Sequence, residues 1–209
     1  MNRYIKTYTI PILILFHFIG LIGMVFINLE RFAALSIYNL LLSVILIFIS
    51  HASSQFNFLK LFIPVFVLGY LVELLGIITS FPFGNYHYGE ALGFKLYDVP
   101  LIIGANWFML VMGSGFFVRK VISQPWLQVF AGALVMVIVD YPIEHMASTL
   151  DYWYWDGNNI PLSNFLGWFF VSIIMQILFV KYMNKETNHL AIPYLIVVSV
   201  FFVLLNLFI

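Results

Sequence analysis

The sequence contains no cysteine. Disulfide bridges, thiolate metal sites and cysteine nucleophiles are therefore excluded, and the redox compartment stays undetermined. Charge is also scarce: 9% of the 209 residues are charged, whereas about a quarter are charged in a soluble domain. The nine basic and nine acidic residues give no net charge, so nothing indicates a nucleic-acid partner or a polybasic surface.

Apolar residues are abundant instead, at 63% of the chain. They form runs long enough to cross a bilayer as helices. We expect an all-α integral membrane protein: one domain, residues 1–209, forming a single bundle of about seven transmembrane helices. The expected helices are 8–28, 33–51, 58–79, 99–118, 126–146, 164–183 and 190–208. The first run lacks a small-residue cleavage pattern, so we interpret it as a retained helix. We see no internal repeat.

The basic residues predict the orientation of the bundle. With a cytoplasmic amino end, the inner segments hold Arg3, Lys6, Lys60, Arg119, Lys120, Lys181 and Lys185. The outer segments hold only Arg31 and Lys95. The amino end is therefore expected inside, in the cell (inner) membrane of a bacterium or archaeon, with the lipid bilayer as a partner. The sequence does not fix the oligomeric state.

The two longest loops, 80–98 and 147–163, both fall on the outer face in this orientation. They are rich in Tyr, Trp, Phe and Gly and poor in charge. Tryptophan and tyrosine favour the membrane interface, and irregular backbone at that depth must be covered by protein or line a cavity. The loops are expected either to form a lid over buried groups or to form an interfacial aromatic belt.

Three acidic residues lie within apolar runs. Glu73 is deep in one of them, where a charge costs about 2.5–3.5 kcal/mol on insertion scales, so it is expected to have a function or a partner. Asp140 and Glu144 are four residues apart and share one helix face. Because adjacent carboxyl groups do not both ionise readily, one can act as general acid beside a general base. The competing interpretation is a set of structural hydrogen bonds between helices.

Several classes of membrane protein can be weighed against this inventory. A retinal protein needs a lysine inside the bundle, and the last run, 190–208, has none. A membrane di-iron enzyme needs closely spaced histidines, whereas the five histidines here are scattered, so no metal site is expected. His87 and His145 flank the acids and are expected near the site, and His17 is expected to be structural or interfacial. A proton-coupled transporter or carrier stays open, because buried acids also serve proton relays.

Two blocks of the sequence carry a recognisable pattern. The first has Glu73, Gly76, Thr79, Phe83, Gly84, Tyr86, Tyr88, Leu92, Gly93, Val99, Pro100 and Trp107. The second has Asp140, Glu144, Trp153, Trp155, Gly157, Ile160, Pro161, Asn164, Leu166, Gly167 and Trp168. In these blocks the chain resembles the carotenoid biosynthesis family of membrane proteins, specifically cofactor-independent carotenoid 1,2-hydratases of the bisanhydrobacterioruberin hydratase type. Ser80 and His145 depart from the usual glycine and proline.

The resemblance implies addition of water across the terminal double bond of an acyclic carotenoid end group. Protonation would give a tertiary carbocation, and water would capture it as a tertiary alcohol without a cofactor. The implied substrate is an acyclic or monocyclic carotenoid of the lycopene or γ-carotene type. A lycopene-type cyclase using the same protonation is the alternative, although its Pro-Glu-Glu signature is absent.

Roles for individual residues follow from this resemblance together with residue type and depth. Glu73 is expected to be the general acid, and Asp140 with Glu144 to orient water and act as base, or the reverse. Aromatic faces would stabilise the cation, by about 2 kcal/mol when desolvated. The residues expected to contact substrate or water are Phe83, Tyr86, Tyr88, Asn106, Trp107, Trp153, Trp155, Asn164 and Trp168.

Overall fold

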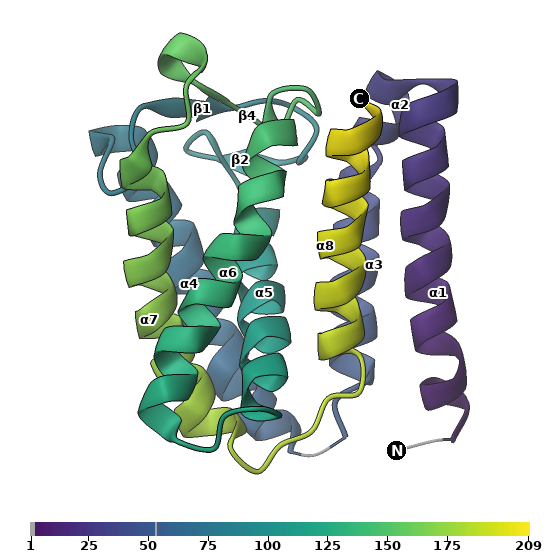
Figure 1. The fold of residues 1–209 in the computed structure, drawn as a ribbon, viewed down its shortest axis with the longest axis vertical. Helices are drawn as coiled ribbons and strands as arrows, with labels where there is room; N and C mark the ends of the chain where they lie inside the picture. Colours follow the sequence, from purple (N-terminus) through teal and green to yellow (C-terminus); the bar gives the residue numbers. More distant parts are fainter. Residues whose placement is uncertain (1–2, 53) are drawn as a thin grey trace.

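The computed structural model describes residues 3–52 and 54–209, with side chains from Thr7 onwards. Its helices are α1 (Arg3–Ile22), α2 (Leu29–Ala33), α3 (Ser36–Ile49), α4 (Gln55–Thr79), α5 (Ile102–Arg119), α6 (Pro125–Ala147), α7 (Leu162–Met183) and α8 (Ala191–Phe208), with a π-helical turn η1 (Gly23–Ile27) and a 3-10 turn η2 (Asp156–Asn158) (Figure 1). The side chains of Arg3 and Lys6, on which the orientation prediction draws, lie outside those described.

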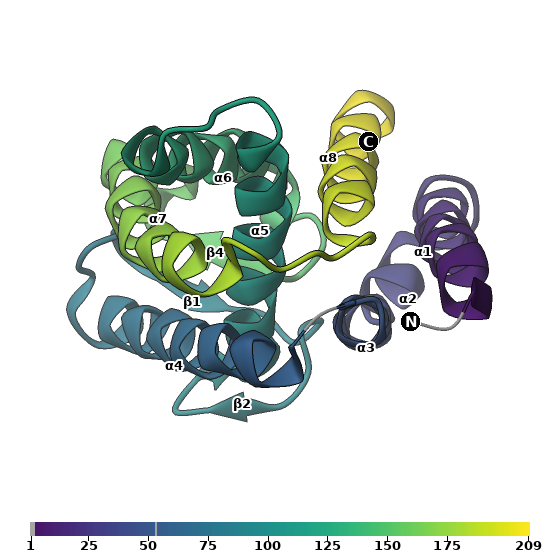
Figure 2. The ribbon, with the colours of Figure 1, turned by 90° about the horizontal axis from the view of Figure 1, so that it is seen from below.

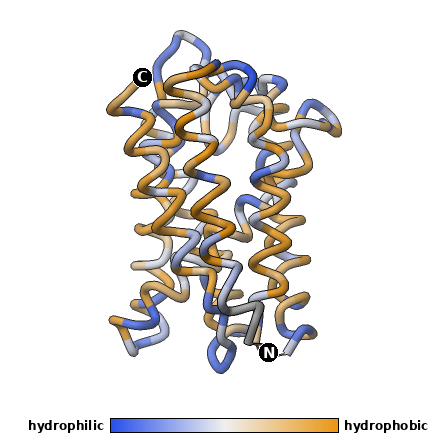
Figure 3. Tube along the Cα trace, turned by 90° about the vertical axis from the view of Figure 1, so that its right-hand side faces the viewer, coloured by the Kyte–Doolittle hydropathy of each residue, from blue (hydrophilic) through white to orange (hydrophobic). Residues whose placement is uncertain are grey.

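Seven helical stretches in the described residues are long and apolar enough to cross a membrane. They are Thr7–Ile27, Leu29–Ile49, Gln55–Thr79, Ile102–Arg119, Pro125–Ala147, Leu162–Met183 and Ala191–Phe208. The prediction of about seven such helices is confirmed. Apolar residues fill the middle of the bundle and hydrophilic residues gather at its two ends (Figure 3), as expected for helices that match a hydrocarbon core of about 30 Å.

The helices form two groups, seen most clearly along their axes (Figure 2). Helices α4, α5, α6 and α7 make one group, and α1, α3 and α8 lie beside it. Helix α5 joins the groups, because it contacts α4, α6 and α7 on one side and α3 and α8 on the other. Its small residues permit this close packing: a Cβ atom on Gly104 would lie 2.5 Å from the backbone oxygen of Phe66.

Four short strands, which the sequence analysis did not predict, occur in the loops: β1 (Tyr86–Tyr88), β2 (Lys95–Leu96), β3 (Val99–Pro100) and β4 (Trp153–Trp155). β1 and β4 pair antiparallel, with Tyr86 opposite Trp155 and Tyr88 opposite Trp153. The two aromatic loops, 80–98 and 147–163, are thereby joined across one end of the bundle, the end at which the chain terminates (Figure 1). Strands this short show no alternating pattern long enough to recognise in sequence.

Candidate active site

Glu73 lies buried near the end of α4 and accepts three hydrogen bonds. The hydroxyl groups of Tyr86 and Tyr88 donate to Oε2 at 2.5 and 2.8 Å, and the indole Nε1 of Trp107 donates to Oε1 at 3.0 Å. Successive side chains of a strand alternate in direction, so residues 86 and 88 of β1 both face Glu73. Gly76 makes room for this approach, because a Cβ atom there would lie 2.8 Å from the Tyr86 hydroxyl.

Glu144 of α6 is held by a matching arrangement from the other loop. The indole Nε1 atoms of Trp153 and Trp155 donate to Oε2 at 2.9 and 2.8 Å. Asn164, at the start of α7, donates from Nδ2 to Oε1 at 2.7 Å. Each buried carboxyl group therefore takes two donors from a strand and one from the helix that follows that strand. Pairing of β1 with β4 links the two arrangements.

The two donor sets differ chemically. All three groups around Glu144 donate through N–H, and the two indoles can only donate, whereas a tyrosine hydroxyl can donate or accept. The surroundings of Glu144 therefore suit a carboxylate, while those of Glu73 suit either a carboxylate or a carboxylic acid. Burial, and after it the charge of Glu73, raises the pKa of both Tyr86 and Tyr88 above the usual tyrosine value. Both hydroxyl groups thus keep their protons at neutral pH.

A small cavity of about 20 Å³ lies between the two carboxyl groups. This is room for about one water molecule, which needs roughly 10–15 Å³ on the same measure. The cavity is lined by Glu73, Phe83, Tyr86, Tyr88, Ile103, Asn106, Trp107, Glu144, Trp153, Trp155, Asn164 and Trp168. Its walls are mainly aromatic, and the rings of Trp107 and Trp168 stack with centroids 3.8 Å apart. The structure thus brings together all nine residues expected to contact substrate or water; their roles stay predictions.

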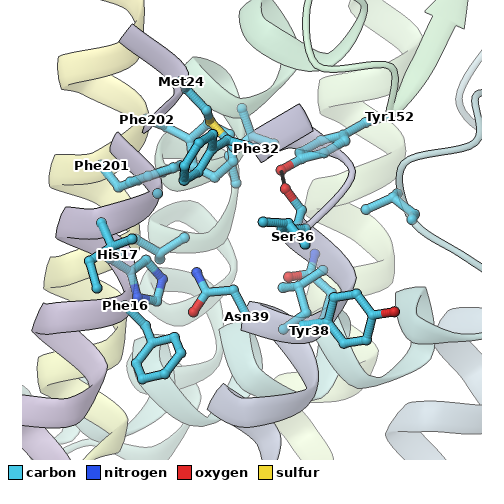
Figure 4. A pocket seen from close by; sticks show the side chains of 18 of the residues that line it. Phe16, His17, Met24, Phe32, Ser36, Tyr38, Asn39, Tyr152, Phe201 and Phe202 are labelled. Atoms are coloured by element: carbon cyan, nitrogen blue, oxygen red, sulfur yellow. Dashed lines mark hydrogen bonds between the residues drawn. The ribbon is translucent and has the colours of Figure 1, made fainter. Parts of the chain in front are cut away.

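A larger cavity of about 310 Å³ adjoins the small one. Ile103, Asn106 and Trp153 line both cavities. No hydrogen bond within the described residues engages the Asn106 side chain, so its amide is available where the two cavities meet. Figure 4 shows the large cavity from close by, with His17 of α1 and Asn39 of α3 on its wall and the Tyr152 hydroxyl donating to Ser36 Oγ at 2.6 Å.

Residues 31–209 match the family described as "Carotenoid biosynthesis protein". The chain belongs to this family. Membership supports a carotenoid-modifying role and a carotenoid substrate, and together with the seven apolar helices it fits an integral membrane protein. The match begins within α2, so it covers both carboxyl groups and all four strands but not α1.

The chain is also similar to bisanhydrobacterioruberin hydratase of Haloarcula japonica. The two are 25% identical over 118 residues, which are 53% of this chain and 40% of the relative. The matched part thus spans less than half of the relative's length. No solved structure shows a significant match.

Asp140 lies apart from the other predicted site residues. It sits one helical turn before Glu144 on α6 and is 1% exposed, yet it is not among the residues that line either cavity. Neither carboxylate oxygen has a hydrogen-bond partner within the described part of the chain. Its direct contact with water therefore stays a prediction without geometric support.

The expectation for His87 and His145 is wrong, because both side chains point away from the acids. His87 lies on the outward face of β1 and stacks on Tyr154, with centroids 5.4 Å apart. His145 is exposed, and its ring lies tilted against that of Tyr141, with centroids 4.5 Å apart. Neighbours in a strand face opposite sides, and neighbours in a helix differ by about 100° in direction. A residue directly next to a site residue in the sequence therefore points away from the site, as His87 and His145 do. Within the described residues, no three His, Asp or Glu side chains form a group suited to a metal ion.

Alanine at these two histidines is therefore expected to leave activity nearly unchanged. Each substitution removes a surface ring contact, and His145→Ala also removes the contact of Nδ1 with the Tyr141 carbonyl oxygen one turn earlier in the same helix. Surface substitutions usually change stability by less than about 0.5 kcal/mol. Pigment conversion in membranes, normalised to protein amount, measures the effect. A loss of conversion in either variant at normal protein level would contradict the position given to these side chains.

The tyrosines beside Glu73 give a larger expected effect. Tyr88→Phe removes one donor to a carboxylate, a bond worth about 1.5–3 kcal/mol, so conversion should fall by about 10- to 100-fold. Tyr97→Phe is the matched control, because Tyr97 lies in the same loop, is exposed and makes no side-chain hydrogen bond within the described residues. Equal activity of the two variants would rule out a contribution of the Tyr88 hydroxyl.

Large-cavity residues such as His17, Asn39 and Phe201 were not predicted as part of a site. No sequence pattern marked them, because the aromatic and apolar residues of a cavity wall cannot be distinguished from lipid-facing residues by residue type. His17 was expected to be structural, and its Nδ1 does lie 2.9 Å from the Leu13 carbonyl oxygen, yet its ring also lines the cavity.

Proposed function

We propose that this protein is a cofactor-independent carotenoid hydratase. It adds water across the terminal carbon–carbon double bond of an acyclic end group and forms a tertiary alcohol. One observation carries the proposal: two buried carboxyl groups with unlike donor sets face one water-sized, aromatic cavity. Hydration of an alkene needs a proton donor, a water molecule and a base within an apolar cavity. The two carboxyl groups and the water-sized space between them can supply all three.

Glu73 is the proton donor in this proposal. Its proton passes to the CH carbon of the double bond, a C–H bond forms, and the π bond breaks to leave positive charge on the tertiary carbon. Tyr86 and Tyr88 then both donate to the new carboxylate. Charge-assisted hydrogen bonds of this kind are roughly twice as strong as neutral ones. Tyrosine hydroxyl groups can adapt to both states of Glu73, which supports this assignment over the reverse one.

The carbocation would be stabilised by its aromatic surroundings. Trp107, Trp168 and Trp155 line the cavity, and a cation over the face of such a ring gains about 2 kcal/mol when desolvated. The Glu144 carboxylate adds an opposite charge. Exclusion of bulk water limits proton loss and unwanted side reactions.

Glu144 is the base that completes the addition. A water molecule beside Glu144, held also by Asn106, attacks the tertiary carbon through its oxygen and gives one proton to the carboxylate. The balance is one water added to one double bond. To reset the site, a proton must move from Glu144 to Glu73 through the cavity that both line. Asp140 is buried one helical turn from Glu144 and would act on Glu144 rather than by touching the water.

The test is expression in a bacterium that makes lycopene or γ-carotene, followed by mass analysis of its pigments. Hydration adds the mass of one water for each reacted end. Pigment of unchanged mass with an altered chromophore would instead indicate cyclisation. Unaltered pigment in cells that contain the membrane-inserted protein would favour a carrier or transporter.

A further inference from the structure

The large cavity reaches the apolar surface of the protein between α1 and α3. Several of its lining side chains are exposed there: Phe16 and Ile19 of α1 at 47% each, Leu35 at 49% and Tyr38 at 67%. Figure 4 shows Phe16 and Tyr38 at the edge of this cavity, on α1 and α3 respectively. In a membrane-spanning bundle, an apolar surface at mid-helix faces lipid. The cavity therefore opens sideways toward the bilayer.

At its other end the large cavity meets the candidate active site. Ile103, Asn106 and Trp153 belong to both linings. The end of a ligand entering between α1 and α3 would meet these three residues at the boundary of the water-sized space between Glu73 and Glu144. A route thus runs from lipid to the carboxyl groups without crossing either end of the bundle.

The size of the cavity limits what it can enclose. Enclosing pockets for small ligands have about 300–1,000 Å³, and the volume here is about 310 Å³. A whole acyclic carotenoid is far larger than this, but an end segment of a few isoprene units is not. The remaining polyene would have to extend out of the opening, where lipid is a suitable solvent for it.

We propose that the cavity between α1, α3, α5 and α8 binds only the end segment of an isoprenoid chain, which enters laterally from the bilayer while the rest of the chain stays in lipid. This inference rests on the proposed function for the identity of the ligand. It has a direct consequence: the protein selects an end group and does not sense the far end. The two ends of a symmetric substrate then react in separate binding events.

Gly20 offers a way to close the route. It lines the cavity on α1, and a Cβ atom there would contact only the ring of Phe201, at 3.6 Å, so a methyl group fits but a phenyl group occupies the cavity. Gly20→Phe should lower both pigment retained on purification and hydrated product by about tenfold or more. Leu15→Phe is the matched control, since Leu15 is exposed on α1 and outside the cavity.

A second variant tests the same route in case Gly20→Phe does not fold. Leu35→Trp adds bulk at the opening, where the native side chain is already exposed, and the same losses are expected. Wild-type retention and conversion by folded Gly20→Phe or by Leu35→Trp would overturn the lateral route. A third outcome separates the two proposals: the wild type retains pigment, both variants lose it, and none of the three proteins forms hydrated product. The lateral route then holds and the proposed function fails.

A time course with lycopene tests the separate-event consequence independently. Both ends of lycopene are identical, so a protein that releases the chain between events should accumulate the singly hydrated pigment before the doubly hydrated one. Appearance of the doubly hydrated pigment alone, at every time and at low protein amount, would contradict binding of one end at a time.

Discussion

Glu73→Gln is expected to lower hydration by about 10²- to 10⁴-fold, the usual contribution of a general acid. Glutamine keeps the size and an acceptor oxygen, so Tyr86, Tyr88 and Trp107 can still pack around it, but it has no proton to give to an alkene. The measurement is conversion of carotenoid in membranes that contain equal amounts of wild-type and variant protein.

The control for Glu73→Gln is the same change at an exposed carboxylate of the following loop. Glu90 pairs with Lys95 at the surface, with 2.8 Å between Oε1 and Nζ, and lies outside both cavities. Glu90→Gln should convert pigment at the wild-type rate. Turnover by Glu73→Gln equal to that of Glu90→Gln would remove the acid role of Glu73.

Glu144→Gln is expected to cause a comparable loss of conversion and, unlike Glu73→Gln, to loosen the loop 147–163. Oε2 of Glu144 accepts from two indole N–H groups, which can only donate, and Oε1 accepts from the side-chain amide of Asn164. The neutral oxygen of a glutamine would accept the two indole bonds only about half as strongly as a carboxylate, and its N–H group would need the Asn164 amide to turn over. Limited proteolysis of membranes should therefore cut this loop faster in Glu144→Gln than in the wild type.

Asp156→Asn supplies the control for that comparison. Asp156 lies in the same loop, is exposed, and accepts from Asn85 Nδ2, which asparagine can also do. This variant should keep both normal activity and normal resistance to protease. Should Glu144→Gln resist proteolysis as well as Asp156→Asn and convert pigment equally well, Glu144 would be neither base nor anchor for β4.

The helices were predictable because their signal is local. A run of apolar residues that spans the bilayer predicts a helix without knowledge of its neighbours, and α4 at Gln55–Thr79 lies close to the expected 58–79. The fourth helix was expected from residue 99, but Val99 and Pro100 pair with β2, and α5 begins at Ile102. Hydropathy does not separate a short apolar strand from the first turn of an apolar helix.

The identity of the candidate site residues could be predicted, but their partners could not. Unusual residue types in apolar runs single out Glu73 and Glu144. Which side chains satisfy them depends on how two loops, more than 60 positions apart, pair with each other. Asp140 has the same sequence signature as Glu144 and is equally buried, yet it does not line the cavity. Residue type does not show which buried side chain faces a cavity.

The two carboxyl groups also occupy equivalent positions in two similar units, α4–β1–α5 and α6–β4–α7. In each unit an acid on the first helix is bonded to alternate residues of the strand and to one residue of the second helix. The pattern of hydrogen bonds is thus repeated in the two units, and the chemistry of the donors is not. If hydroxyl groups on one side and indoles on the other decide which acid gives the proton, the direction of proton flow is set by four aromatic side chains and not by the pattern of hydrogen bonds that both units share.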